Sequence, residues 1–232
     1  EKPNSSGKCS EFAKKGSTAF KQQAYLEAIR LYTEAVQSFN SLDQASRALS
    51  NLVSVFQKLE ATHCALYCAQ AVLTLDPSNV KTHYRRAVCV MECNHHDVAQ
   101  SIVNALLERS AQIGKGFVNH VKKLKVLNAT RRKQHEQGIY DWKTIGTQLH
   151  DGKDPDMAEY LSPKVKLHMY RNKGRGFIAT DYIEAGELIM VSKCIAVLEG
   201  DPHSSQAVAE EISNRASLDD DLLYKLYFLT DG

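Results

Sequence analysis

The chain has 232 residues, of which 43% are hydrophobic and 24% are charged, and its formal net charge is +2. These values are ordinary for a globular protein with room for two modest domains, and they argue against a dedicated nucleic-acid binder. No apolar run approaches the roughly 20 residues of a membrane span. Residues 1–8 lack a secretory apolar stretch, so we expect an intracellular protein of the cytoplasm, the nucleus or both.

Cysteine spacing gives a further indication of compartment. The two pairs that lie four residues apart fall inside apolar runs, and none of the cysteines forms a C-x-x-C pair. We therefore expect reduced thiols in a helical core, as in an intracellular protein. A metal site with nearby histidines is the alternative, but zinc sites usually show tighter paired spacing. The residues concerned are Cys9, Cys64, Cys68, Cys89, Cys93, Cys194, His63, His95 and His96.

A helix break in the first half of the chain organises everything around it. An apolar periodic run closes at Leu75, and Asp76-Pro77 then stops it, because proline cannot continue a helix and restricts the residue before it. Ser78-Asn79 supplies N-cap chemistry, and a new periodic run begins at once. The pattern predicts two helices joined by a tight turn.

Small residues at recurring positions predict three such helix pairs. Antiparallel helices joined by a short turn approach closely only where side chains are small, and larger residues fill the space to the next pair. We place the repeats at 9–42, 46–79 and 80–113, and we expect Ala28 and Ala99 to be buried at helix crossings. The register residues are Gly16, Ala28 and Ala35, then Val53, Ala65 and Val72, then Ala87, Ala99 and Leu106.

The Leu-Asp-Pro break, followed by Lys-x-x-Tyr-Arg-Arg-Ala up to Ala87, resembles the joint between two tetratricopeptide (TPR) repeats. The resemblance implies a mainly α fold, a TPR α-solenoid of three helical hairpins over residues 1–137. The alternative is an unrelated helical bundle.

Residues 112–137 continue the pattern without a partner and suit the capping helix that closes a repeat array. The run Arg131-Arg132-Lys133 is either a nuclear-import patch or, more commonly, a solvated helix face.

The pattern changes after the array. Gly138 ends the capping helix, and residues 138–162 are predicted to be a linker in which Tyr140 and Trp142 anchor a segment on the solenoid. From residue 163 the period becomes two, with alternating Val165, Leu167 and Met169, which is typical of a half-buried strand. Further strands are predicted at 177–179 and 188–191, separated by a turn at 185–186, and short helices at 204–216 and 219–229.

Residues 172–189, which begin Asn-Lys-Gly-Arg-Gly-Phe-Ile-Ala and continue into an acidic Ala-Gly turn, resemble the opening of a SET domain. That is the fold of protein lysine methyltransferases, so residues 163–232 would be the small β-rich N-terminal part of one. The resemblance implies that Gly174, Arg175 and Gly176 lie where the backbone approaches S-adenosylmethionine, since glycine lets a ligand come close. The alternative is a structural hairpin of another β fold.

The joined layout resembles the fungal-type TPR–SET proteins, which are related in layout to the SET–MYND methyltransferases. The first hypothesis is therefore the N-terminal portion of a protein (histone) lysine methyltransferase whose array binds partners or substrate. By this resemblance, the family's Asn-His-x-Cys-like segment and its late tyrosine would lie beyond Gly232. We therefore expect no methyl transfer by these residues and weak or absent cofactor binding, which leaves open whether the protein is an enzyme.

The alternative hypothesis is a non-catalytic TPR scaffold, a co-chaperone-like adaptor for acidic C-terminal peptides such as chaperone tails. The chaperone-binding TPR class holds such a carboxylate with five polar ligands from three repeats. By position, the resemblance carries over Asn51, Lys81 and Arg85, whereas Ala13 and Ser17 occupy the two repeat-one positions. Paired cations suit carboxylates. Three ligands in place of five predict micromolar or weaker binding that fades with added salt.

Overall fold

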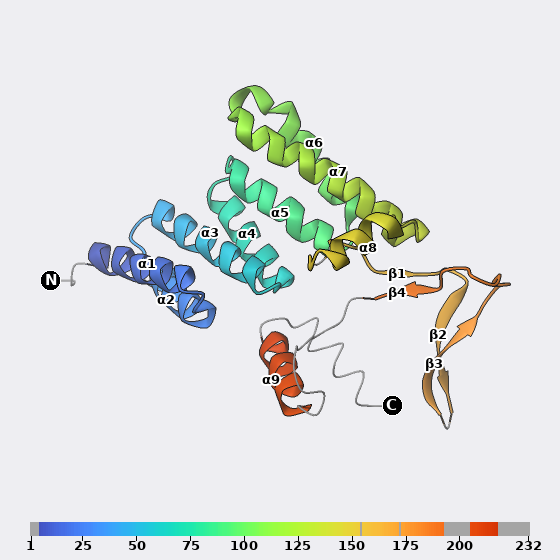
Figure 1. Cartoon of the computed structure of the whole chain (residues 1–232). Helices are drawn as coiled ribbons and strands as arrows, with labels where there is room; N and C mark the ends of the chain where they lie inside the picture. Colours follow the sequence, from blue (N-terminus) through green and yellow to red (C-terminus); the bar gives the residue numbers. More distant parts are fainter. Residues whose placement is uncertain (1–4, 154, 172, 193–204, 218–232) are drawn as a thin grey trace.

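Three helix hairpins form the first part of the computed structural model (Figure 1), which describes residues 5–153, 155–171, 173–192 and 205–217. The hairpins pair α1 (Ser5–Lys21) with α2 (Tyr25–Gln37), α3 (Leu42–Lys58) with α4 (Thr62–Leu75), and α5 (Val80–Glu92) with α6 (His96–Glu108). A short 3-10 helix (Ser110–Gln112) leads to α7 (Lys115–Gln137), which packs on α6. The predicted TPR-type array with a capping helix is confirmed as the arrangement of these elements.

The same backbone turn closes each hairpin. Gln23, Glu60 and Asn94 adopt left-handed conformations, with φ of 61°, 58° and 61°. In each turn the N–H of the following residue donates to the carbonyl five residues earlier at 3.0 Å. This is a Schellman-type helix ending, which satisfies carbonyls that the helix end would otherwise leave without a donor. The recurrence of one turn in three places shows that the hairpins are true structural repeats.

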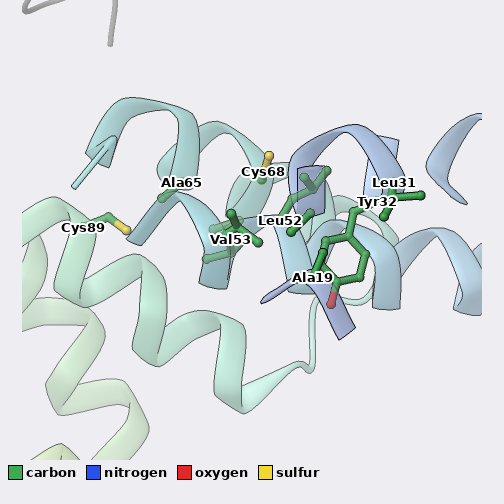
Figure 2. Packing of buried hydrophobic residues seen from close by; sticks show 11 residues of the cluster. Ala19, Leu31, Tyr32, Leu52, Val53, Ala65, Cys68 and Cys89 are labelled. Atoms are coloured by element: carbon green, nitrogen blue, oxygen red, sulfur yellow. The ribbon is translucent and has the colours of Figure 1, made fainter. Parts of the chain in front are cut away.

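The core of the array lies where the small residues were expected. All nine register positions are buried, and Ala28 and Ala99 are each 0% exposed, which confirms their predicted place at helix crossings. A Cβ atom on Gly16 would lie 2.9 Å from the ring of Tyr32, so only glycine fits there. Figure 2 shows Tyr32 packed with the larger residues that fill the space between successive hairpins.

Burial also determines the chemistry of the helical thiols. Cys68 and Cys89 are buried, and desolvation raises their pKa values to about 11 and about 12. Both thiols therefore stay protonated at neutral pH, since the thiolate is disfavoured in apolar surroundings. Within the described residues, no group of three His, Cys, Asp or Glu side chains is placed to hold a metal ion, and Cys194 lies outside those residues.

Charged residues of the capping helix are used internally. Arg131 is buried and forms ion pairs with Glu92 at the end of α5 (2.7 Å) and with Asp156. Arg132, which is partly exposed, pairs with two further carboxylates, and Lys133 is exposed. The tripeptide is therefore not displayed as a basic patch.

No helix in the described part of the chain is both long enough and apolar enough to cross a membrane.

Short elements follow the array. Gly138 ends α7 with φ of 65°, and the chain continues through α8 (Trp142–His150), β1 (Tyr160–Leu161), β2 (Val165–Tyr170), β3 (Gly174–Ala179), β4 (Met190–Val191) and α9 (Ser205–Ala216). Two antiparallel pairs result, β1 with β4 and β2 with β3. The predicted strands overlap β2, β3 and β4, of which β4 covers only Met190–Val191 of the predicted 188–191. The predicted turn at 185–186 is present, and α9 matches the predicted helix over its described residues. The predicted helix at 219–229 lies outside the described residues.

Two expectations for this part need correction. Residues 138–162 were expected to be a linker, but they contain α8, whose N-cap Asp141 accepts from the N–H of Thr144 at 3.1 Å. The strand at 165–169 was expected to be half-buried, yet only Val165 is buried, while Leu167 and Met169 are each 60% exposed. In the described residues β2 pairs only with β3, so the outer part of this hairpin packs against no second layer.

The end of the expected linker is bound to the array. The backbone N–H of Ala158 donates to Oε1 of Gln134 at 2.9 Å, and the hydroxyl of Tyr140 donates to the Ala158 carbonyl at 2.7 Å. A ring nitrogen of His135 lies 2.9 Å from the carbonyl oxygen of Glu159. Together with the ion pair of Asp156, these contacts fix residues 156–160 on the last turns of α7. The hydroxyl of Tyr140 thus bonds within the segment, and Trp142, which stacks on Tyr140, is 53% exposed, so their predicted role as anchors on the solenoid stays a prediction.

Candidate peptide-binding groove

A groove of about 540 Å³ is lined by residues of α1, α3 and α5, the first helices of the three hairpins, and of α7. The arrangement follows from the repeats, because equivalent helices in stacked hairpins line the same side of a solenoid. Its lining combines cations with aromatic rings and contains no carboxylate. The lining residues are Phe20, Ser54, Gln57, Lys58, Lys81, Tyr84, Arg85, Val88 and Phe117.

Two of the predicted ligands, Lys81 and Arg85, line this groove. Their position is set by Asn79, whose side chain accepts from the N–H of Thr82 at 3.0 Å and caps α5. Lys81 therefore falls in the first turn of the helix, with Arg85 one turn further on the same face. Lys81 is exposed and Arg85 is half-buried. The Lys81 ammonium is thus open to solvent, whereas the Arg85 side chain is partly enclosed.

Arg85 is oriented by the neighbouring hairpin. Its Nη1 donates to the carbonyl oxygen of Ser50 in α3 at 2.7 Å. Desolvation lowers the pKa of the guanidinium, but arginine remains protonated in proteins. Because the guanidinium carries five N–H donors, the bond to the Ser50 carbonyl leaves other donors available to a ligand. The same bond fixes the plane of the guanidinium.

Asn51, the third predicted ligand, is not among the lining residues. It is half-buried in α3, three residues before Ser54 and seven before Lys58. This spacing places it on the same helix face as both, one turn before the lining begins. The structure therefore brings Lys81 and Arg85 together and leaves Asn51 next to the groove.

Lys58 completes the positive charge of the groove, and sequence reasoning missed it. It is exposed in the last turn of α3. A basic residue at this position is explained equally well by the helix dipole, which favours cations at C-termini. What identifies Lys58 as a groove residue is the packing of α3 on α5. The preceding residue, Gln57, contacts α5, with its Nε2 3.6 Å from Sγ of Cys89.

Aromatic side chains form the walls of the groove. Tyr84 of α5 and Phe117 of α7 meet edge to face, with ring centroids 5.4 Å apart at 64°. Phe20 of α1 lines the opposite side. Burial raises the pKa of Tyr84, so its phenol stays neutral at physiological pH. Rings of this kind offer apolar contact area to a ligand side chain without adding negative charge.

The first helix offers no cation to the groove. Its contribution to the lining is Phe20. One turn earlier, the Ser17 hydroxyl donates to the Ala13 carbonyl at 2.9 Å and lies 3.1 Å from the hydroxyl of Tyr32. The hydroxyl of Ser17 is therefore already engaged within the hairpin.

The predicted cofactor residues Gly174, Arg175 and Gly176 open strand β3. Gly174 has φ of 72°, and it pairs with Tyr170 at the tip of the hairpin. A Cβ atom on Gly176 would lie 3.2 Å from the ring of Tyr170. The hairpin itself thus accounts for both glycines. Their role toward S-adenosylmethionine stays a prediction.

Comparisons with known proteins fall into two groups. The chain is 34% identical over 98 residues to an Hsp70-Hsp90 organizing protein 2 of Arabidopsis thaliana, a match that covers 42% of this chain and 17% of that protein. It is 22% identical over 205 residues to a methyltransferase of Gibberella zeae, covering 85% of this chain and 27% of that protein. The chain therefore spans well under a third of either relative.

One solved structure illustrates the structural comparisons. The TPR2B domain of yeast Sti1, in a complex with an Hsp70 peptide, aligns with a TM-score of 0.49 and 21% identity. The alignment covers 54% of this chain and 98% of that domain. No protein-family model matches the sequence.

Proposed function

We propose that the chain is a TPR adaptor whose groove binds acidic peptides, such as the tails of Hsp70- and Hsp90-type chaperones. The observation that carries the proposal is the lining: Lys58, Lys81 and Arg85 face one groove with no carboxylate among its lining residues. Cations without an internal counter-ion favour an anionic ligand, because charge-assisted hydrogen bonds are short and strong. The aromatic walls add a site for an apolar side chain of the same ligand.

The similarity to the Arabidopsis protein supports the choice of ligand. Its 98 matched residues are fewer than a complete three-hairpin array contains, yet they reach 34% identity. That protein is named for organising Hsp70 and Hsp90, and a chaperone tail is the kind of acidic peptide that this groove suits. The ligand class thus follows from the chemistry of the lining, and the name of the relative suggests chaperones as its source.

We expect the chain to bind a short acidic peptide with micromolar or weaker affinity. The test is a calorimetric titration of the 232-residue chain with a glutamate-rich peptide and with its glutamine counterpart. Binding of the acidic form should weaken as salt is added, since partly exposed charges are screened beyond about 10 Å at 0.1 M salt. Equal affinity for the two peptides would exclude recognition by charge.

A second candidate, part of a longer protein lysine methyltransferase, is favoured by one separate observation. The match to the Gibberella methyltransferase covers 85% of the chain, which is more than residues 1–137 can supply. It therefore extends into the region that holds the β2–β3 hairpin. In this candidate Gly174 to Gly176 would lie against S-adenosylmethionine, which supplies the methyl group, and the array would hold the substrate.

For this second candidate we expect no methyl transfer by residues 1–232. The segment that resembles a SET domain encodes one wall of a cofactor pocket, so S-adenosylmethionine should bind weakly at most. Radiolabelled transfer to histone and non-histone peptides, with calorimetry of the cofactor alone, measures both properties. Robust turnover by this chain would show that the residues for catalysis are already present in it.

A further inference from the structure

The cationic residues of the groove stem from two separate places along its length. The contact between Gln57 and Cys89 sets the last turns of α3 and α5 side by side. Lys81 precedes Cys89 by eight residues, which is roughly 12 Å along a helix that rises 1.5 Å per residue. Lys58 directly follows Gln57. The backbones of Lys58 and Lys81 therefore mark opposite ends of the groove, with the half-buried Arg85 nearer to Lys81.

This arrangement is poorly suited to a free chain terminus. A terminal carboxylate carries both oxygens on one carbon and is held best where several donors converge. Here the backbones of the two lysines are apart, so that only Lys81 lies one turn from Arg85, whose remaining N–H groups are free of the Ser50 carbonyl, and the hydroxyl of Ser17 is engaged with Tyr32. The α1 side of the groove supplies the ring of Phe20 and no charge.

Two separate anions on one extended peptide fit the same arrangement. An extended chain advances about 3.3 Å per residue, so the roughly 12 Å between the lysine backbones corresponds to three or four residues. Between the lysines the lining is apolar, with Tyr84 and Val88 on α5 facing the groove. An apolar side chain between two acidic ones would meet these residues.

We propose that the groove recognises an internal acidic segment, in which two acidic side chains three or four residues apart flank an apolar one, rather than a free C-terminal carboxylate. This inference rests on the proposed function and specifies its ligand. It assigns Lys58 a direct contact with the second carboxylate. Chaperone tails remain ligands in this scheme through their acidic side chains, and acidic segments inside a partner chain become ligands as well.

The test is fluorescence anisotropy of the 232-residue chain with one labelled peptide in three forms. The peptide carries two glutamates three residues apart with a leucine between them, and it ends in a free carboxylate, an amide or a glycine-serine extension. We expect the three affinities to agree within about twofold, and Lys58→Ala to weaken all three at least about fivefold, which is about 1 kcal/mol. Lys21→Ala is the matched control, since Lys21 is also exposed in the last turn of a first helix but does not line the groove.

The outcomes separate this inference from the proposed function. A loss of more than about tenfold on amidation, or a Lys58→Ala chain that binds as the parent does, would overturn the inference while leaving an acidic-peptide groove in place. Failure of all three glutamate peptides to bind would overturn both. Similar affinities for the three forms together with a selective effect of Lys58→Ala would establish recognition of an internal segment.

Discussion

Replacing Arg131 by methionine is expected to lower the free energy of unfolding by about 3 kcal/mol, the lower end of the range for breaking a buried ion pair. The side chain is 5% exposed and lies between the carboxylates of Glu92 and Asp156, whose side chains are 32% and 50% exposed. Methionine keeps most of the apolar volume but removes the cation. The partial exposure of both carboxylates lets water take up part of the loss, which is why the lower end applies.

Urea denaturation followed by circular dichroism measures this effect, and the neighbouring residue provides the control. Arg132 is 42% exposed and forms its ion pairs at the surface, so Arg132→Met should change the stability by less than about 1 kcal/mol. Hydrogen exchange adds a local readout, because residues 156–160 should exchange faster in the Arg131 variant. Equal effects of the two substitutions would contradict the view that Arg131 holds this junction together.

Removing Lys81 and Arg85 together is expected to weaken acidic-peptide binding at least about thirtyfold. Hydrogen bonds to charged groups contribute about 1.5–3 kcal/mol when buried, but Lys81 is exposed and screened, so we expect about 2 kcal/mol for the pair. The measurement is a titration of the Lys81→Ala and Arg85→Ala double variant. Its thermal melt must first show a folded array, since Arg85 also bonds to Ser50.

A control with the same loss of charge tests whether the effect is local. Arg86 lies on α5, the helix that carries Lys81 and Arg85, and Lys14 lies on α1, but neither lines the groove. Changing both to alanine removes two positive charges from the protein and should change the affinity by less than about threefold. A comparable loss in this control would mean that net charge, rather than the groove, attracts the peptide.

The helical array could be predicted because its signal is local and repeated. Close helix contacts require small side chains, so Ala28, Ala65 and Ala99 revealed the hairpins through composition and spacing alone. The turns were less visible: their left-handed residues are Gln23, Glu60 and Asn94 rather than glycine. The Schellman-type hydrogen bonds stabilise that conformation without any marker in the sequence.

The candidate site was predicted only where the repeat register determines it. Lys81 and Arg85 follow from their place after a helix cap, whereas Lys58 becomes a groove residue only through the packing of α3 on α5. The attachment of residues 156–160 to α7 likewise depends on contacts far apart in the sequence, above all those of Arg131. Periodicity cannot reveal such contacts, because no spacing along the chain encodes them.

The attachment of residues 156–160 also determines how a bound peptide meets the strands that follow. Arg131 joins α5, which carries Lys81 and Arg85, to the segment that leads into β1. The connection therefore does not behave as a flexible tether. With a flexible tether, the effective concentration of one linked site at the other would depend on the length of the tether. A peptide held in the groove would instead have a fixed reach, so that residues at only certain distances from its acidic pair could approach the β2–β3 hairpin.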